Sequence, residues 1–597
     1  TISGLANEAV TLSDTTLAAT VLNTLNGYTT GVVNAATVTT LTGFGGDINT
    51  SYSAGSAGEI SGLGNEAVTL TDLTIDGDVL NTVDTNTSGV VNASSVTTLS
   101  GALSDINSAY TANGAGTISD LGDEIISFTD TSATATILNT ADTNTTGIVN
   151  TTNLVTITGD AADVNTVYAA GANGTILGLG NEAITISAPL TVAQFNTLAA
   201  QTTGVITATI SDNDMATLAG LTETGNAYTV TVTDASVDAA ALVALDLKTS
   251  VAVVATAVST LTGSLSDLDA AFTAGGGGSI TGLGAEAVTV SDSGVIAAAE
   301  LNTIDTATTG VVTVSGVTGL TGTVAAVNAA FAGNGVAERI AGLADTETAR
   351  ITDTTVAAAD LITANAHTSG LVTVLSTTLT GNLADLTTIL DLSTAGTAIA
   401  GLGAANITMS ATGGSLTVAN VNTIAGKTTG VVTATVTDAT AVLLATIAET
   451  GHNLTLALTD ASVAASAIST IDPLTDGTFT VSSTTVTGTA AEIIAAYALG
   501  TAGTVTGLGN EAITLSDTTL SAADLISVDA LSTGLVTHTA TTLTGTTEDL
   551  VVIYARGAGS HPRISGTANQ SITVTDSTIS AEYVNALNAL STGLVTF

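Results

Sequence analysis

One phrase recurs along the chain, and its spacing constrains the fold more than any other feature. The phrase I-x-G-L-G-x-E-A, with small variations, begins at Ile2, Ile60, Ile118 and Ile176, in three steps of 58 residues. It returns at Ile280, Ile340, Ile399, Val505 and, in degraded form, Ile564. Self-similarity at a fixed period of this size is typical of proteins built from stacked repeats. The sequence therefore predicts a repeat array.

Two longer intervals, 176–280 and 399–505, each contain a diverged unit. The first has "TGNAYTVTVTDASVDAAALVAL" and the second "TGHNLTLALTDASVAASAISTI", which resemble each other more than the standard repeat. We divide the chain into five segments: 1–175, three repeats; 176–279, a standard plus a diverged repeat; 280–398, two standard repeats; 399–504, a second copy of that cassette; and 505–597, one repeat and a final half repeat. We expect the array to continue beyond both ends.

Each repeat consists of two similar halves of about 29 residues. Alternating aliphatic residues, such as Val10 with Leu12 and Val38 with Leu41, predict a short strand in each half. Apolar residues four apart, such as Leu17 with Val21 and Ile48 with Tyr52, predict a short helix. The predicted fold is an α/β repeat solenoid with short parallel strands alternating with short helices, about 29 residues per coil and 58 per double repeat. The alternative is a string of small α/β repeat domains.

The charge balance excludes several classes of partner. Six Lys and Arg residues against 51 Asp and Glu residues give a net charge of −45, so nucleic acid is not an expected partner. The longest apolar stretch, residues 251–258, is far shorter than the about 20 residues that cross a bilayer, so no transmembrane segment is expected. The absence of cysteine excludes disulfides. These features favour a secreted, cell-surface or extracellular protein.

Two residue types recur at fixed places and predict ladders along the stack. An asparagine in "LNT" or "INT" and its variants can bond to backbone groups of the next coil. Its positions are Asn23, Asn49, Asn81, Asn107, Asn139 and Asn165, with later members at Asn196, Asn302, Asn328, Asn422 and Asn585. An aromatic residue follows in each second half, and its rings could stack at coil spacing. Its positions are Tyr52, Tyr110, Tyr168 and Phe331, with related residues at Phe272, Tyr497 and Tyr554.

An aspartate recurs after the predicted strand, and its role can be interpreted in two ways. Its carboxylate could cap the helical turn by accepting free N–H groups, which we favour. Calcium is the other possibility, although the chain has no D-x-D-x-D-G loop and no glycine-rich nonapeptide of the calcium β-roll. The candidate calcium ligands are Asp14, Asp72, Asp130, Asp292, Asp517 and Asp576, with relatives at Asp234, Asp353 and Asp460.

No residue set predicts catalysis, and we expect that the protein is not an enzyme and requires no cofactor. Glutamates recur in "NEA" at Glu8, Glu66, Glu182 and Glu511, where a solvated or turn-bonding role is favoured, because catalysis needs unlike neighbours rather than identical sites. The four histidines, at 367, 452, 538 and 561, lack metal-site spacing.

The words "GLGNEAVTLTD", "LNTVDTNTSGVVNASSVTTLSG" and "LSDINSAY" carry a resemblance. They resemble the tandem repeats of giant secreted cell-surface proteins of marine picocyanobacteria, a group that includes the giant surface protein linked to flagellum-independent swimming. The resemblance covers essentially the whole chain and implies a cell-surface or extracellular structural role.

We expect an extracellular structural protein that forms a rod, filament or surface-layer component by end-to-end or lateral self-association into a homo-polymer. The alternative is the stalk region of a large adhesin or glycan-binding surface protein. Surface glycans and outer-membrane components are the further partners considered, and the diverged units at about 221–279 and 447–504 are where a binding patch is expected.

Overall fold

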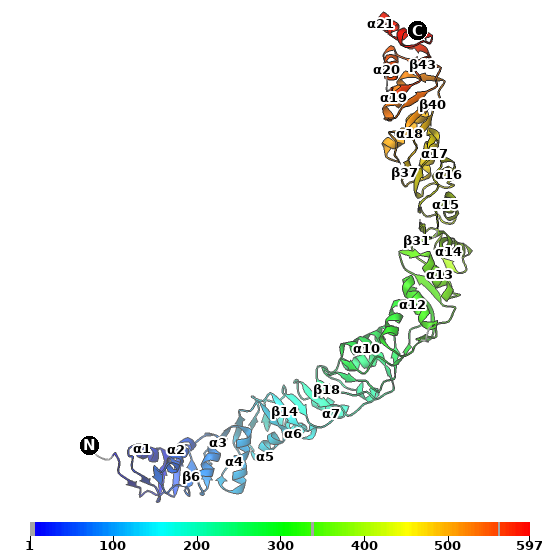
Figure 1. Cartoon of the computed structure of the whole chain (residues 1–597). Helices are drawn as coiled ribbons and strands as arrows, with labels where there is room; N and C mark the ends of the chain where they lie inside the picture. Colours follow the sequence, from blue (N-terminus) through cyan, green and yellow to red (C-terminus); the bar gives the residue numbers. More distant parts are fainter. Residues whose placement is uncertain (1–5, 336–338, 413, 559–561) are drawn as a thin grey trace. The chain divides into compact units, whose positions relative to one another are not determined.

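The computed structural model describes residues 6–335, 339–412, 414–558 and 562–597 (Figure 1). Ile2 and His561, two positions named above, lie outside these residues. The chain forms two compact units: unit 1 runs up to Thr289 and includes Ala307–Gly310, and unit 2 comprises Val290–Thr306 and the chain from Val311 onwards. The boundary falls inside the repeat that begins at Ile280.

Helices recur once per coil in both units. Those of unit 1 are α1 (Ala19–Asn26), α2 (Gly45–Ser56), α3 (Gly77–Asn86), α4 (Leu103–Ala115), α5 (Ala135–Asn144), α6 (Ala161–Asn173), α7 (Val192–Ala199), α8 (Met215–Leu218), α9 (Ala239–Asp246) and α10 (Leu265–Gly277). Those of unit 2 are α11 (Ala298–Ala307), α12 (Val324–Gly335), α13 (Ala358–His367), α14 (Leu383–Ala395), α15 (Val418–Ala425), α16 (Ala441–Leu444), α17 (Ala465–Ile471), the 3-10 turn η1 (Asp472–Leu474), α18 (Ala490–Ala502), α19 (Ala522–Leu531), α20 (Thr547–Gly557) and α21 (Ala581–Leu590).

The strands of unit 1 form several short parallel sheets. In order of pairing they are β1 (Val10–Thr11), β3 (Val33–Asn34) and β5 (Ile60–Ser61); then β2 (Thr16–Ala18), β4 (Thr40–Gly43), β6 (Ala67–Leu70), β8 (Val91–Asn92) and β10 (Ile118–Ser119). A third sheet has β7 (Thr74–Asp76), β9 (Thr98–Gly101), β11 (Ile125–Phe128), β13 (Val149–Asn150) and β15 (Ile176–Leu177). A fourth has β12 (Ser132–Thr134), β14 (Thr156–Gly159), β16 (Ala183–Ile186), β17 (Ile206–Thr209) and β18 (Ala227–Thr229). Further parallel pairs are β19 (Ser236–Asp238) with β21 (Thr260–Gly263), and β20 (Val253–Val254) with β22 (Ile280–Thr281).

Unit 2 repeats this arrangement. Its sheets have β24 (Gly294–Ala297), β26 (Val317–Gly322), β28 (Thr348–Ile351), β30 (Val372–Val374) and β32 (Ile399–Ala400); then β29 (Thr355–Ala357), β31 (Thr378–Gly381), β33 (Asn406–Met409), β34 (Val432–Thr435), β35 (Asn453–Leu458), β37 (Phe479–Val481) and β39 (Val505–Thr506). The last two have β36 (Ser462–Ala464), β38 (Thr485–Gly488), β40 (Ala512–Leu515), β42 (Val536–His538) and β44 (Ile564–Ser565); and β41 (Thr519–Ser521), β43 (Thr542–Gly545), β45 (Ser571–Val574) and β46 (Val595–Thr596). A further pair joins β25 (Val312–Val314) and β27 (Ile340–Ala341).

The strands alternate between buried aliphatic residues and outward hydroxyl residues. In β6, Val68 and Leu70 are about 1% exposed, whereas Thr69 between them is partly exposed. Because successive side chains of a strand point to opposite faces, this pattern puts one row of aliphatic groups into the core of each coil. The apolar faces of the helices cover the same core, through Leu80 and Val83 of α3. The α/β repeat solenoid is therefore confirmed within each unit.

The sheets cross the boundaries of the 58-residue repeats, so the alternative of separate domains is wrong. Leu17, Leu41, Val68, Val91 and Ile118 are aligned in one sheet that spans parts of three repeats. This sheet begins at β2, just before helix α1, and ends at β10, just after helix α4. A new sheet starts in each double repeat, for example at β7, before the previous sheet has ended at β10. The sheets that begin at β2, β7 and β12 therefore overlap along the stack of unit 1, and hydrogen bonds join each of these repeats to the next.

Two details of the predicted elements were wrong. Leu17 lies in strand β2 rather than in a helix, and Val38 lies in the turn before β4. In α1 the buried residues are Ala19 and Leu22, while Val21 is 53% exposed. The spacing-by-four pattern failed because a strand residue just ahead of the helix supplied its first member.

Candidate functional site

The glutamate of the repeated phrase is exposed at Glu8 but is buried between coils in later repeats. Glu66, Glu124, Glu182, Glu286, Glu347 and Glu511 are each at most 5% exposed. In the repeat starting at Ile118, the Oε2 atom of Glu124 accepts a hydrogen bond from the Gly122 N–H at 2.9 Å. The Tyr110 hydroxyl, from α4, donates to the same oxygen at 2.8 Å. The predicted turn bonding is present, but these carboxylates are not solvated.

The same tyrosine–glutamate bond occurs in four repeats, and the glutamate always follows the tyrosine by 14 positions. The Oη–Oε2 distances are 3.2 Å for Tyr52–Glu66, 2.8 Å for Tyr110–Glu124, 3.0 Å for Tyr168–Glu182 and 2.7 Å for Tyr497–Glu511. Burial, followed by the charge of Glu124 and the bond to it, raises the pKa of Tyr110 well above its usual range. The phenol therefore remains a protonated donor.

A third coil closes the arrangement through a Thr-x-Gly triplet. The Thr145 hydroxyl donates to the backbone carbonyl of Glu124 at 2.7 Å and accepts the Gly147 N–H at 2.9 Å. A Cβ atom on Gly147 would lie 2.3 Å from that same Glu124 carbonyl oxygen, so only glycine fits here. We call this combination of tyrosine, glutamate and Thr-x-Gly triplet the clasp.

Sequence analysis missed the triplet, although it recurs visibly. The Thr or Ser that begins it donates to a carbonyl of the preceding coil at each of these positions: Thr29, Thr87, Thr145, Thr202, Thr308, Thr368, Thr428, Thr475, Ser532 and Ser591. The signal was the return, once in each standard repeat, of a Thr or Ser two residues before a glycine, as T-T-G, T-S-G or S-T-G.

Variation among the repeats shows which partners of the clasp depend on each other. Where the tyrosine is Leu390, the position of the glutamate is Ala405, and both are buried. Phe272 and Phe331 precede Glu286 and Glu347, which still accept backbone N–H groups. The Tyr554 hydroxyl, followed by Gln570 instead of a glutamate, is buried without a hydrogen-bond partner among the described residues. The fold thus accepts a polar or an apolar pair at this place.

The aromatic rings do not stack on one another, so that part of the prediction was wrong. Successive members, such as Tyr52 and Tyr110, lie in helices α2 and α4, with α3 between them. Among the described residues, ring contacts join other partners: Phe195 meets Tyr228 edge to face at 4.7 Å, and Phe331 stacks on His367 at 6.0 Å. Tyrosines of the clasp link coils through their hydroxyl groups instead, at Tyr52, Tyr110, Tyr168 and Tyr497.

The asparagine ladder links each helix to the next. Asn81 Nδ2 donates to the carbonyl of Asp105, the third residue of the following helix α4, at 2.8 Å. The same bond is made by Asn23, Asn49, Asn107, Asn139, Asn302 and Asn328 to the third residue of the next helix. Asn165 differs, since its Oδ1 accepts from Gln201 Nε2 at 3.2 Å.

The aspartates cap helices, but the helix is that of the preceding coil. Asp130 Oδ2 accepts the N–H of Leu103, the first residue of α4, at 2.7 Å. Equivalent bonds are made by Asp72 to Gly45, Asp353 to Val324, Asp517 to Ala490 and Asp576 to Thr547. Asp14 is exposed, and Asp292 is partly buried after β23 (Ala287–Val290). An acceptor at this place also complements the positive end of the helix dipole.

These aspartates are spread one per double repeat rather than gathered. Within the described ranges, no three His, Asp or Glu side chains lie close enough together to hold a metal ion. His452 and His538 are buried in separate coils, and burial lowers the pKa of His538. No helix of the described chain is both long and apolar enough to span a membrane.

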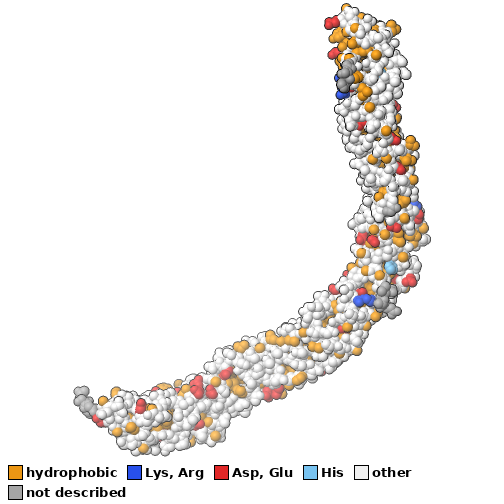
Figure 2. Space-filling model, in the orientation of Figure 1, with side chains coloured by type: hydrophobic (Ala, Val, Ile, Leu, Met, Phe, Trp, Pro, Cys, Tyr) orange, Lys and Arg blue, Asp and Glu red, His pale blue; other side chains and the backbone are white. Residues whose placement is uncertain are grey.

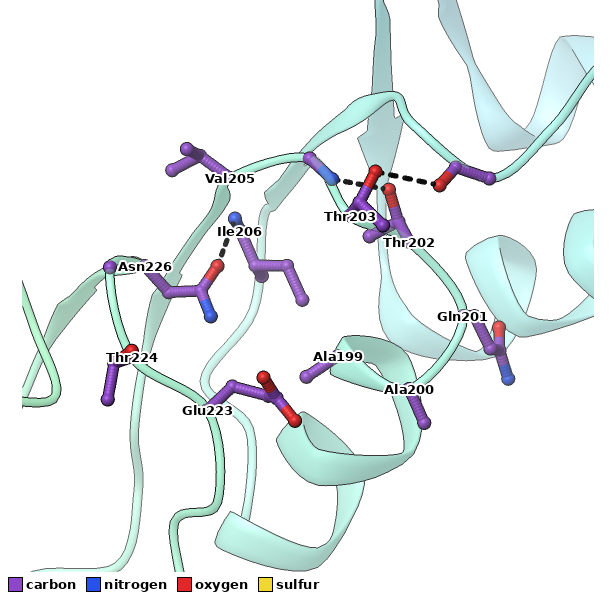
Figure 3. A pocket seen from close by; sticks show the side chains of 13 residues that line it. Ala199, Ala200, Gln201, Thr202, Thr203, Val205, Ile206, Glu223, Thr224 and Asn226 are labelled. Atoms are coloured by element: carbon purple, nitrogen blue, oxygen red, sulfur yellow. Dashed lines mark hydrogen bonds between the residues drawn. The ribbon is translucent and has the colours of Figure 1, made fainter.

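The first diverged cassette has a pocket beside its Thr-x-Gly triplet. It has a volume of about 490 Å3 and lies beside the triplet Thr202–Gly204, with Gln201, Glu223 and Asn226 around it (Figure 3). The Oδ1 atom of Asn226 accepts the Ile206 N–H at 2.8 Å. The exposed Glu223 carboxylate lies near the end of α7, at Ala199 and Ala200 (Figure 3). The pocket therefore presents a carboxylate and amides without an aromatic platform.

Comparisons with known proteins give no relative by sequence. The chain matches no protein-family model, and no curated protein matches it. A solved structure described as PEPR1-AtPEP1 has 10% sequence identity and a TM-score of 0.13, with 99% of this chain and 85% of that one covered. A TM-score of this size does not indicate a shared fold.

Proposed function

We propose that the protein is an extracellular structural repeat protein whose coils provide length for a rod, filament or surface layer. One observation carries the proposal: the recurring polar residues, which would be candidates for chemistry in an enzyme, bond one coil to another. The clasp at Glu124, the amide of Asn81 and the cap at Asp130 are examples. Many identical bonds between coils suit a structural protein that becomes long by stacking repeats.

We propose that the setting is salty and that copies associate with one another into a homo-polymer. A chain with a net charge of −45 repels its copies at low ionic strength. At an ionic strength of 0.15 M or above, this repulsion reaches only about 8 Å or less, so neighbouring surfaces can approach. The repeat words that resemble surface proteins of marine picocyanobacteria agree with such a setting.

The second candidate is the stalk of an adhesin or glycan-binding surface protein. The pocket beside Thr202–Gly204 favours it, because carboxylate and amide groups suit the hydroxyls of a sugar. Replacing Glu223 by Ala should then abolish binding in a glycan array while Thr197→Ala, on the outer side of α7, leaves it intact. If wild-type protein binds no glycan, this candidate fails.

The first candidate is tested by imaging and scattering of the whole chain in seawater-like salt, with and without a calcium chelator. We expect a radius of gyration well above the about 25 Å of a compact protein of this length. We also expect filaments or sheets at high concentration that survive chelation, because the proposal needs no cofactor. Assemblies that dissolve would instead assign calcium to the aspartates. A compact monomer in all conditions would contradict the structural role.

A further inference from the structure

Threonines on the outer face of the sheets form ladders in exact strand register. In unit 1, Thr134, Thr158, Thr185 and Thr207 are consecutive partners across β12, β14, β16 and β17. In unit 2, Thr380, Thr408 and Thr433 are consecutive partners across β31, β33 and β34. Both ladders run from a standard repeat into the diverged cassette that follows it.

A second column lies beside each ladder. Thr209 pairs with Thr229 in unit 1, and Thr435 pairs with Thr455 in unit 2. Because residues two apart on a strand share a face, each pair of columns forms a net with steps of about 4.8 Å between strands and about 6.6 Å along a strand. We call the two nets the threonine face: Thr158, Thr185, Thr207, Thr209 and Thr229 in unit 1, and Thr408, Thr433, Thr435 and Thr455 in unit 2.

The hydroxyls of the threonine face differ from those of the clasp. Thr145 and its equivalents are bonded to a carbonyl of the neighbouring coil. The hydroxyls of the threonine face bond to no other group of the described residues, and Thr185, Thr207, Thr209, Thr229, Thr408, Thr435 and Thr455 are exposed. Each of these side chains therefore offers a methyl group and a hydroxyl with both donor and acceptor capacity to whatever lies outside.

The face carries no charge, although the molecule has 51 acidic residues. Figure 2 shows the same tendency over one side of the molecule, where acidic side chains are scattered among uncharged ones. A partner for such a face is recognised by regular spacing rather than by charge. We propose that the threonine face binds the surface of ice.

The geometry of water supports this partner. Water molecules bonded tetrahedrally at about 2.75 Å place their next-nearest oxygens about 4.5 Å apart. Strand spacing exceeds this by about 0.3 Å, so the mismatch over a ladder of four threonines reaches only about 1 Å. Hydroxyls on the ladder can then take the place of successive water oxygens, while the methyl groups occupy the spaces between them. Short ladders suit this role because longer ones would fall out of register.

The test uses the whole chain in two assays: inhibition of ice recrystallisation, and partition into a slowly growing ice hemisphere. The test variant has Thr185→Lys, Thr207→Lys, Thr408→Lys and Thr433→Lys. The control variant has Thr140→Lys, Thr197→Lys, Thr363→Lys and Thr423→Lys, which lie on exposed sides of α5, α7, α13 and α15. Both variants gain the same charge, and circular dichroism with thermal unfolding shows whether each is folded.

We expect the wild type and the control to enter ice and to slow crystal growth, and the test variant to need at least a fivefold higher concentration. Serine at the same four positions keeps the hydroxyls and removes only the methyl groups, so it gives a second reading should the lysine variant misfold, and we expect it to lose activity. Exclusion of the wild type from ice, or equal losses in test and control variants, would overturn the proposal. Binding to crystalline cellulose or chitin without any effect on ice would also overturn it and would assign the face to a polysaccharide.

Discussion

The standard repeats and the diverged cassettes build the same stack from coils of different length. In the standard repeats, helices begin at Gly77, Leu103, Ala135 and Ala161, with steps that alternate between 26 and 32 residues. In the first cassette they begin at Val192, Met215 and Ala239, with steps of 23 and 24, and α8 has only 4 residues. The second cassette repeats this with α16. A coil can therefore lose most of its helix and remain in the stack.

A side chain makes this shortening possible by replacing a backbone group. In the standard repeat, the Val149 N–H donates to the carbonyl of Thr175, which precedes the next strand, at 2.9 Å. In the cassette, the equivalent Ile206 N–H donates to the side chain of Asn226. In the second cassette, the Val432 N–H donates to Nδ1 of His452 at 3.2 Å. The strand N–H thus keeps a hydrogen-bond acceptor in the stack, although a side chain replaces the backbone carbonyl that accepts the bond in the standard repeat.

The largest expected loss of stability comes from filling the close contact between the glycine of the Thr-x-Gly triplet and the preceding coil. Gly147→Ala places a Cβ atom 2.3 Å from a backbone oxygen, so we expect a local loss of about 3 kcal/mol, at the upper end for overpacking. Hydrogen exchange across residues 118–175 measures it. Gly114→Ala in α4 meets nothing within 4 Å and should leave exchange unchanged. In the cassette, Val251 occupies the place of this glycine, so Val251→Gly should have little effect.

The glutamate of the clasp comes next. Glu124→Ala leaves the buried Tyr110 hydroxyl and the Gly122 N–H without an acceptor, which should destabilise this region by about 2–3 kcal/mol. The double variant Tyr110→Leu with Glu124→Ala copies the natural pair Leu390 and Ala405 and should recover part of the loss. Hydrogen exchange for the two single variants and the double variant gives the coupling energy. Fully additive losses would contradict a shared bond.

The amide that shortens the cassette should have a somewhat smaller effect. Asn226→Ala leaves one buried strand N–H, that of Ile206, without a partner, and we expect a loss of about 1–2 kcal/mol. Asn226→His should be tolerated, because His452 occupies this place in the second cassette. Exchange of the Ile206 amide reports the change directly. A histidine variant as unstable as the alanine variant would show that the two cassettes are not interchangeable here.

The caps between coils are expected to contribute less. Asp130→Ala removes the acceptor for the first N–H of α4 and should cost about 1 kcal/mol. Asp14→Ala, at an exposed residue of the same sequence pattern, is the matched control and should be neutral. Faster exchange at the start of α4 would locate the effect. Faster exchange in α5 instead would show that the aspartate acts on the helix that follows it.

Tyrosine ionisation has the smallest expected effect on the stability of the fold at neutral pH. The effect increases as the pH is raised. The pKa of Tyr110 is raised in the folded chain above the value of about 10 in an unfolded one, so the unfolded chain binds fewer protons above that pH. Stability from this group is complete below pH about 10 and is lost as the pH rises further. Tyr52, Tyr168 and Tyr497 share the shift, and burial raises the pKa of Tyr228 in the cassette to about 12.

Ultraviolet absorbance of tyrosinate, followed together with circular dichroism, checks this prediction. We expect ionisation of the clasp tyrosines to coincide with loss of structure, and Tyr110→Phe to remove one such group without moving the transition of the others. Ionisation of these tyrosines near pH 10 with the fold intact would contradict it.

The positions of the polar ladders could be predicted more readily than their partners. Asp130 stands only five residues before α5, so its sequence context favours a cap on α5, yet it bonds to Leu103 at the start of α4. The aromatic row was visible, but whether Tyr110 met another ring or a carboxylate depended on which coil lay against it. The Thr-x-Gly triplets escaped notice because a glycine forced by a carbonyl at 2.3 Å is indistinguishable in sequence from any turn glycine.

The sequence by itself determined the period, the alternation of strand and helix, and the parallel stacking, because each follows from where apolar residues recur. Tertiary structure alone decided which strands share a sheet. Strands of one sheet pair at steps of 24, 27, 23 and 27 residues, from Leu17 through Leu41, Val68 and Val91 to Ile118, whereas helices advance by 26 and 32. The period of the sequence does not reveal these partners, because they are chosen by backbone hydrogen bonds between strands that lie against each other only in the folded stack.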